Sequence, residues 1–206
     1  MRRTRTSLKV SKSPVHRTHS PTQRFFAFAD ATHLDIWVLD QLEELFARAR
    51  SDPEVSAKLR EPGIVFFLHL LGLDTTGHTY RPFSTEYIGN TIVVDAISRR
   101  VEQLMDEFYE HENKTAYIFS ADHGMSTKGN HGDGDPDNTR TPLVAWGAGI
   151  NAPTPADEQQ KEFRQNDAES DPYFRDWVTA DITRFDVDQA DITPLMVSPG
   201  CAIENA

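Results

Sequence analysis

The stretch "GIVFFLHLLG", residues 63–72, is a nearly continuous apolar run of strand length. Such a run is typical of a parallel strand whose two faces are both buried. A second run of this kind is "TAYIFSADHGM" (115–125), and "TPLVAWGAGI" (141–150) is a third candidate strand. Between the first two, apolar residues recur at helical spacing behind Ser84, which can cap a helix. A strand, a helix and a strand at this spacing predict a right-handed parallel crossover, and therefore an α/β fold.

Two more helices are predicted on either side of this pattern. Upstream, Asp30 can cap a helix whose apolar residues recur at helical spacing until the Asp-Pro pair at 52–53 interrupts them. Downstream, "VDQADITPLM" (187–196) indicates a short helix with Asp188 or Asp191 as its cap. Both segments add to the helical content expected of an α/β domain.

The charge of the chain is unevenly distributed. The 206 residues are 38% hydrophobic and 26% charged, as in a globular protein, and no apolar run is long enough to cross a membrane. Residues 1–24 hold seven Lys and Arg and no acid, which leaves 14 bases against 32 acids in the remainder. That acidic remainder predicts no nucleic-acid binding and suits metal cations. The single cysteine, Cys201, excludes an internal disulfide.

Two segments have no periodic pattern. Residues 1–24 are basic and rich in Ser and Thr, which predicts disorder; a transit-peptide-like segment and a segment outside the fold are the alternative interpretations. Residues 151–180 are acidic and polar, and we interpret them as an irregular surface excursion.

Polar side chains follow both of the first two predicted strands. Asp74 and His78 come after the first, between glycines that favour a loop, and the pair Asp122 and His123 comes after the second. Because the carboxyl ends of parallel strands meet at one edge of a sheet, these loops and the later glycine-rich loop of His131 are expected to lie together. Two Asp and three His match the ligands of zinc, with manganese a poorer fit, and five ligands suit two metal ions.

Each part of this group has a local structural alternative. Asp122 and His123 alone are compatible with an ordinary turn after a strand, and His69 with a packed core residue. The three aspartates of residues 133–137 are spaced as in a calcium loop but lack the terminal Glu of an EF-hand. The metal prediction therefore depends on three polar loops taken together.

Two long motifs, "FFLHLLGLDTTGHTYRP" (66–82) and "FSADHGMSTKGNHGDGDPDNTRTPLVAWGAGI" (119–150), resemble the lumenal catalytic domain of the GPI ethanolamine phosphate transferase 1 family. "DATHLDIWVLDQLEELF" (30–46) and "VDQADITPLM" (187–196) extend the resemblance, which runs from about residue 26 to 196. It is more specific than the metal-ligand pattern that all alkaline-phosphatase-like phosphodiesterases share.

The resemblance carries particular roles to five residues. Asp74 and His78 match the Asp-x-x-x-His pair on one zinc, and His131 in Gly-x-His-Gly matches its third ligand. Asp122 and His123 match the Asp-His pair on a second zinc. The glycines would then let a tight loop turn both side chains toward one ion. We expect one well-formed zinc site and a second, weaker one.

The resemblance also implies an activity. Members of this family are zinc-dependent enzymes of the endoplasmic reticulum membrane that act on its lumenal face. They transfer phosphoethanolamine from phosphatidylethanolamine to the first mannose of a GPI-anchor precursor, through a threonine nucleophile. No segment here matches the strand that carries that threonine, and Thr22 is only a weak candidate. We therefore expect a fragment that is inactive alone. A self-sufficient metal-dependent phosphodiesterase or phosphomutase, and a non-catalytic zinc-binding remnant, are the alternatives.

The implied fold is a parallel-sheet, alkaline-phosphatase-like sandwich that is incomplete, because the first strand and the nucleophile segment have no match. The chain then divides into a basic segment (1–24), a partial metal-binding domain (25–198) and a divergent tail (199–206). An incomplete sheet is expected to leave residues 62–71 and 116–119 partly exposed.

Overall fold

The computed structural model describes residues 31–111, 113–157, 182–183 and 186–197, which form two compact units. The helical unit comprises the described residues up to Asn113 together with His123–Pro142, and the strand unit comprises Lys114–Asp122 and the described residues from Leu143 onward. Several predictions lie outside the described residues: those for residues 1–24 with Thr22, for the Asp30 cap, for most of 151–180 and for the tail 199–206.

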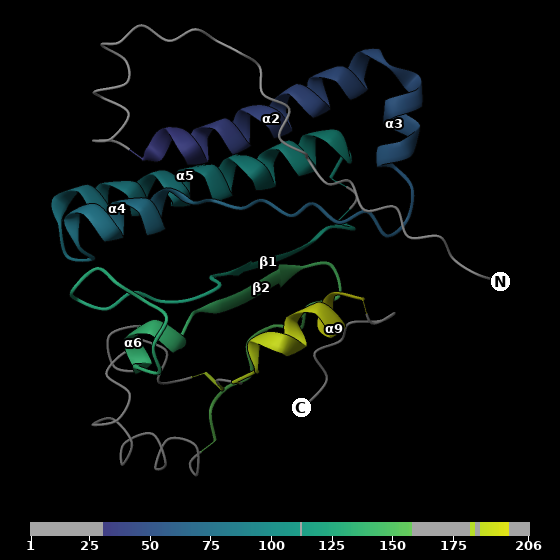
Figure 1. The fold of residues 1–206 in the computed structure, drawn as a ribbon. Coiled ribbons are helices and arrows are strands. Elements are labelled where there is room, and N and C mark those ends of the chain that lie inside the picture. The colour runs from purple at the N-terminus through teal and green to yellow at the C-terminus, as the bar shows by residue number, and fades with distance from the viewer. Residues whose placement is uncertain (1–30, 112, 158–181, 184–185, 198–206) are drawn as a thin grey trace, which may run out of the picture. The chain divides into compact units, whose positions relative to one another are not determined.

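The helical unit is built around three packed helices. Helices α2 and α5 lie side by side, and α4 packs against both (Figure 1). The bounds of the helices in this unit are α2 Thr32–Ser51, α3 Pro53–Leu59, α4 Gly72–Tyr80, α5 Thr85–Phe108 and α6 Pro136–Thr139.

Local capping sets several of these boundaries as predicted. The Ser84 hydroxyl accepts a hydrogen bond from the Tyr87 N–H at 3.1 Å, which satisfies one free donor at the start of α5. Helix α2 ends before Asp52, whose carboxylate accepts from the first N–H groups of α3, and Pro53 occupies the first turn of that helix. The break expected at 52–53 is therefore confirmed.

Aromatic packing forms the core of the helical unit. Phe46 of α2 is fully buried, and its ring centroid lies 4.7 Å from that of Phe108 on α5 and 5.7 Å from that of Phe66. Burying a side chain of this size contributes about 1.5–3 kcal/mol to stability. Phe66 thus holds the segment that precedes α4 against the two long helices.

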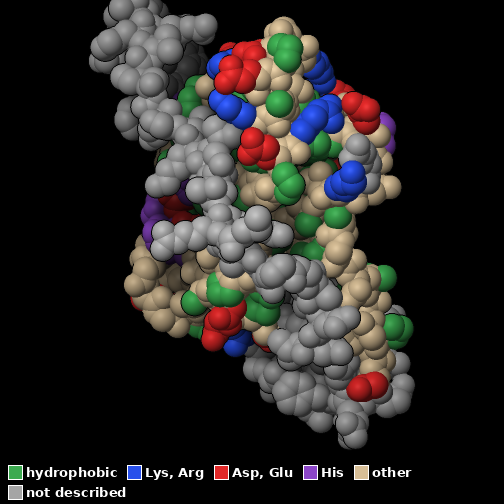
Figure 2. All heavy atoms as spheres, turned by 90° about the vertical axis from the view of Figure 1, so that its right-hand side faces the viewer, with side chains coloured by type: hydrophobic (Ala, Val, Ile, Leu, Met, Phe, Trp, Pro, Cys, Tyr) green, Lys and Arg blue, Asp and Glu red, His purple; other side chains and the backbone are tan. Residues whose placement is uncertain are grey.

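The surface of the helical unit is polar and mixed in charge. Figure 2 shows acidic and basic side chains interspersed on one face. Ion pairs within the helical unit include Arg50 with Glu107 at 3.2 Å and Arg60 with Glu110 at 3.3 Å. Exposed pairs of this kind add little to stability. None of the helices that the structure describes is both long and apolar enough to cross a membrane.

The prediction of a buried strand over residues 63–72 is wrong. Residues 64–71 form neither a helix nor a β-ladder with any described residue, and α4 begins at Gly72. The side chains alternate: Phe66 and its even-numbered neighbours are partly buried, whereas Val65, Phe67 and Leu71 are exposed, Phe67 by 82%. With helices on one side and no described strand beside it, the segment is buried on one face only. The expected partial exposure of residues 62–71 is confirmed.

The strand unit contains an antiparallel pair where a parallel sheet was predicted. Strand β1 (Ala116–Ser120) pairs with β2 (Leu143–Gly147), in a register that sets Ala116 opposite Gly147 and Ser120 opposite Leu143. The predicted parallel crossover required a first strand at 63–72. Because that strand is not formed, the second and third candidate strands pair with each other. The α/β class is confirmed, whereas the alkaline-phosphatase-like sandwich stays a prediction.

The rest of the strand unit agrees in part with the sequence. Rings of Tyr117 and Trp146, which are paired across the ladder, stack with centroids 5.2 Å apart. A short 3-10 helix, η1 (Gln189–Asp191), leads into α9 (Ile192–Val197), so the predicted helix is confirmed. Asp188 occupies the position before η1 but makes no capping hydrogen bond with its side chain.

Candidate metal centre

Helix α4 places Asp74 and His78 on one face. The two residues are four apart on the helix, and Asp74 Oδ1 lies 3.4 Å from His78 Nε2. The prediction of a glycine-flanked loop here is therefore wrong, because the segment is helical from Gly72 to Tyr80. Helical spacing of 3.6 residues per turn brings residues i and i+4 together without any special loop geometry.

The glycines of α4 have a packing role. The Gly72 N–H donates to Asp35 Oδ1 of α2 at 2.8 Å, and a Cβ at Gly72 would lie 2.2 Å from Asp35 Oδ2. A Cβ at Gly77 would lie 2.3 Å from the sulfur of Met125. Glycine in a helix costs about 1 kcal/mol relative to Ala, but here it permits close contacts on both sides of α4.

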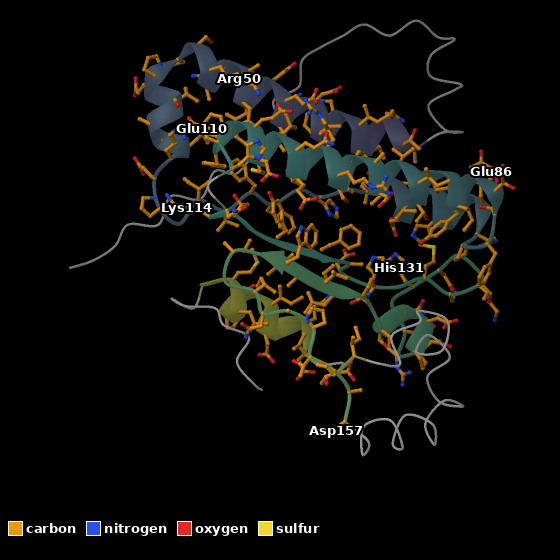
Figure 3. The ribbon with its side chains drawn as sticks, turned by 180° about the vertical axis from the view of Figure 1, so that it is seen from behind. Arg50, Glu86, Glu110, Lys114, His131 and Asp157 are labelled. Carbon is orange, nitrogen blue, oxygen red and sulfur yellow. The ribbon has the colours of Figure 1, made fainter. Side chains whose placement is uncertain are left out.

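His131 reaches the same site from the loop that precedes α6 (Figure 3). Its Nε2 lies 3.1 Å from His78 Nε2 and 3.2 Å from Asp74 Oδ1. The backbone of Gly129, with φ +74°, positions this loop and offers its carbonyl to His78 Nδ1 at 2.8 Å. Because a carbonyl only accepts, His78 Nδ1 carries the proton and neutral His78 has its lone pair on Nε2, toward the site.

The three ligand atoms form a small triangle with edges of 3.1, 3.2 and 3.4 Å. Tetrahedral zinc with bonds of 2.0–2.1 Å holds its ligand atoms about 3.3 Å apart, so the spacing fits such an ion. Asp74 Oδ1 is buried and accepts no hydrogen bond from the described residues. The group Asp74, His78 and His131 could therefore hold a metal ion, and the side chains remain 28–45% exposed, which leaves an open approach.

His123 stands beside this group. Its ring stacks on that of His131 with centroids 3.6 Å apart, and its Nε2 lies 3.9 Å from Asp74 Oδ1. His123 Nδ1 is 2.9 Å from the Gly124 carbonyl oxygen, which fixes the orientation of the ring. Three imidazoles thus surround one carboxylate oxygen within the helical unit.

Asp122 belongs to the strand unit and lies two residues after the end of β1. Its backbone carbonyl accepts a hydrogen bond from Gln189 Nε2 at 2.6 Å, and the Ala121 carbonyl accepts from the same nitrogen at 3.3 Å. The assignment of Asp122 and His123 to a second zinc stays a prediction.

Two neighbours of the site were not identified from the sequence. Tyr87 lies in the first turn of α5; its ring packs against Gly77, and its pKa is raised by burial and by the charge of Asp74. Arg81 ends α4 with a positive φ of 80°. Two features of the sequence could have indicated these neighbours. Tyr87 is a tyrosine within an apolar stripe, and Arg81 is an arginine three residues after the candidate ligand His78.

The aspartates of residues 133–137 are engaged in local structure. Asp133 Oδ1 accepts from the Asp135 N–H at 3.0 Å and from the side chain of Asn138, and Asp135 Oδ1 accepts from the Asp137 N–H at the start of α6. Turn and cap formation accounts for their spacing.

Curated relatives match most of this chain. It is 53% identical over 168 residues to GPI ethanolamine phosphate transferase 1 of Emericella nidulans, a match that covers 82% of this chain and 17% of the relative. The corresponding proteins of Aspergillus oryzae and Candida glabrata are 53% identical over 168 residues and 48% identical over 163 residues, and 16% and 17% of their lengths are covered. The chain thus spans about one sixth of the length of these relatives. No protein-family model and no solved structure matches it.

Proposed function

Because this chain is homologous to a segment of the fungal GPI ethanolamine phosphate transferase 1 proteins, we propose that it supplies the zinc-binding part of a site that transfers ethanolamine phosphate during GPI-anchor synthesis. In this proposal Asp74, His78 and His131 bind one zinc ion. Asp122 and His123 contribute to a second. Zinc held by these residues would act as a Lewis acid on a phosphoryl oxygen.

The observation that carries the proposal is the triangle of ligand atoms around the buried Asp74 Oδ1. A carboxylate oxygen and two imidazole nitrogens are a common set of three protein ligands for catalytic zinc, in which the fourth position stays open. The Gly129 carbonyl orients the His78 ring and fixes its tautomer, a role that outer-shell partners of metal-bound histidines typically have.

The substrates follow from the homology and are part of the proposal. The name of the relatives, GPI ethanolamine phosphate transferase 1, refers to both ethanolamine phosphate and GPI. We propose phosphatidylethanolamine as the donor, the first mannose of a GPI-anchor precursor as the acceptor, and the lumenal face of the endoplasmic reticulum membrane as the location. Since the chain spans 16–17% of the relatives, we propose that it does not perform the transfer by itself.

Zinc titration tests the metal site. We expect calorimetry on the metal-free chain to show one tight zinc, and His78→Ala to weaken it by about 100-fold or more, since outer-shell losses alone cost 10–100-fold. His111→Asn is the matched control: it removes an exposed imidazole from the turn that follows α5 and should leave zinc affinity unchanged. Equal affinities of the wild type and His78→Ala, or no binding, would contradict the proposal.

The same proteins distinguish the proposed role from that of a self-sufficient phosphodiesterase. We expect a p-nitrophenyl phosphodiester to be cleaved slowly at most, and only while zinc is present. Rapid, chelator-sensitive turnover by the isolated chain would show a complete hydrolytic site and would contradict the claim that this chain needs further segments.

A further inference from the structure

Arg81 has a backbone conformation that is unusual for its residue type. It ends α4 with φ 80° and ψ 155°, a region that glycine enters freely and that L-residues with a Cβ avoid. Such strain persists only where surrounding contacts impose it, and it is concentrated at functional sites.

Backbone hydrogen bonds hold Arg81 in this state. Its N–H donates to the Gly77 carbonyl at 3.0 Å, and its own carbonyl accepts from the N–H and the hydroxyl of Ser84, at 3.2 and 2.9 Å. The residue therefore links the end of α4 to the cap of α5. Glycine would satisfy the same bonds without strain, so these bonds do not explain why an arginine stands here.

The side chain of Arg81 lies against the peptide that orients His78. A Cβ added to Gly129 would lie 2.6 Å from Arg81 Nη1 and 2.9 Å from Arg81 Cδ, so the guanidinium packs directly on Gly129. The Gly129 carbonyl holds His78 Nδ1, and His131 follows two residues later. The cation is thus next to the loop that carries one of the three candidate ligands, His131, and that orients a second, His78.

Within the part of the chain that the structure describes, the Arg81 guanidinium forms no ion pair. Among the described residues, no side-chain hydrogen bond is formed by it either, although the chain as a whole carries a net charge of −11. An exposed guanidinium beside a site that holds a divalent cation would be repelled by it, unless an anion lies between them. A phosphoryl group fits that position, because guanidinium binds two phosphate oxygens in a planar fork.

We propose that Arg81 binds the non-bridging oxygens of the substrate phosphoryl group at this site. The proposal rests on the proposed function, and it adds a substrate-binding residue to the metal ligands. The proposal also accounts for the strained backbone of Arg81. The positive φ lets the side chain lie over Gly129, and phosphate binding requires that this side chain be an arginine.

The test uses inorganic phosphate as the probe and calorimetry on the full chain, with and without zinc. Arg81→Met keeps the methylene stem that packs on Gly129 and removes the charge. We expect it to bind zinc as well as the wild type and phosphate about 10- to 100-fold more weakly in the presence of zinc. Lys128→Met, which removes an exposed cation from the same loop, is the matched control and should change phosphate affinity less than about threefold.

Arg81→Gly separates binding from backbone strain. Glycine relieves the strained φ, so this variant should melt about 2–4 °C above the wild type while losing phosphate affinity as Arg81→Met does. Unchanged phosphate affinity in Arg81→Met, an equal loss in Lys128→Met, or no phosphate binding by the zinc-loaded wild type would overturn the inference. Failure of the wild type to bind zinc, measured without phosphate, would instead contradict the proposed function.

Discussion

Gly72 lies where two buried polar side chains converge on the start of α4. A Cβ here would stand 2.2 Å from Asp35 Oδ2 and 2.8 Å from Asn90 Nδ2, distances that real Cβ atoms essentially never show. Asp35 is 0% exposed and Asn90 1%, so neither can swing into solvent to make room. The missing side chain is what allows α4 to begin between α2 and α5.

We expect Gly72→Ala to destabilise the protein by about 1–3 kcal/mol, because the added methyl overpacks a site whose neighbours are fixed. Urea unfolding followed by circular dichroism would measure the loss, and the slope of the transition should stay unchanged.

Gly89 provides the opposite case within the same unit. It lies inside α5, and a Cβ added there meets nothing within 4 Å. Gly89→Ala should therefore stabilise the protein by about 0.5–1 kcal/mol, because alanine loses less backbone entropy on helix formation. If Gly72→Ala and Gly89→Ala changed the free energy of unfolding in the same direction, close packing would not distinguish these two glycines.

Among the elements, those with local signals were the ones predicted from the sequence. The Ser84 cap and the helix break at Asp52 and Pro53 depend on residues that are close in sequence, and both were predicted; the capping bonds that Asp52 makes to α3 were not. Helix α4 was not, since its two glycines argue for a loop until Asp35 and Met125 are known to lie against them. The prediction of a strand at 63–72 failed for a related reason. A β-ladder depends on a partner strand that is distant in sequence.

The contact between α2 and α4 should make stability depend on pH. Burial raises the pKa of Asp35, opposed by the Gly72 N–H bond and by the nearby His69 and His33. A carboxyl whose folded pKa is raised contributes stability that is full below its unfolded pKa and is lost as pH rises through the folded value. Asp35→Asn keeps an oxygen for the Gly72 N–H, so its stability relative to the wild type should increase from pH 4 toward neutrality.

Asp133 supplies a control of opposite sign for these denaturation curves. The Asp135 N–H and the Asn138 side chain hold the pKa of Asp133 below its usual range. Its stabilising effect should be present above the unfolded pKa and lost as pH falls, so Asp133→Asn should cost most at neutral pH. A ratio of Asp35→Asn to wild-type stability that does not change with pH would contradict the role given to Asp35.

For the whole molecule, the sequence indicated an α/β protein and a relationship that the comparisons confirm at 46–53% identity over about 80% of the chain. It also brought Asp74, His78 and His131 together correctly, although the parallel sheet used to argue for their proximity is absent from the described residues. The part of this conclusion that concerns Asp74 and His78 held because residues four apart also lie together on a helix.

Zinc should stabilise the folded state of the helical unit. All three proposed ligands belong to the helical unit, so zinc at 100 times its dissociation constant adds about 2.7 kcal/mol if it does not bind the unfolded chain. Thermal unfolding should then show Tm about 5–10 °C higher with zinc than with a chelator. His78→Ala should lose the shift and His111→Asn should retain it; an equal shift in both variants would place the zinc elsewhere.

The pairing of Ser120 with Leu143 has a topological consequence for the site. Residues 121–142, which carry His123 and His131, form a loop whose two ends the β1–β2 ladder ties together. Opening the ladder would lengthen that loop, and the cost of bringing its ends back grows with the logarithm of its length, about 0.6 kcal/mol for each doubling. Through chain connectivity alone, the ladder therefore reduces the conformational entropy of the segment that carries both histidines.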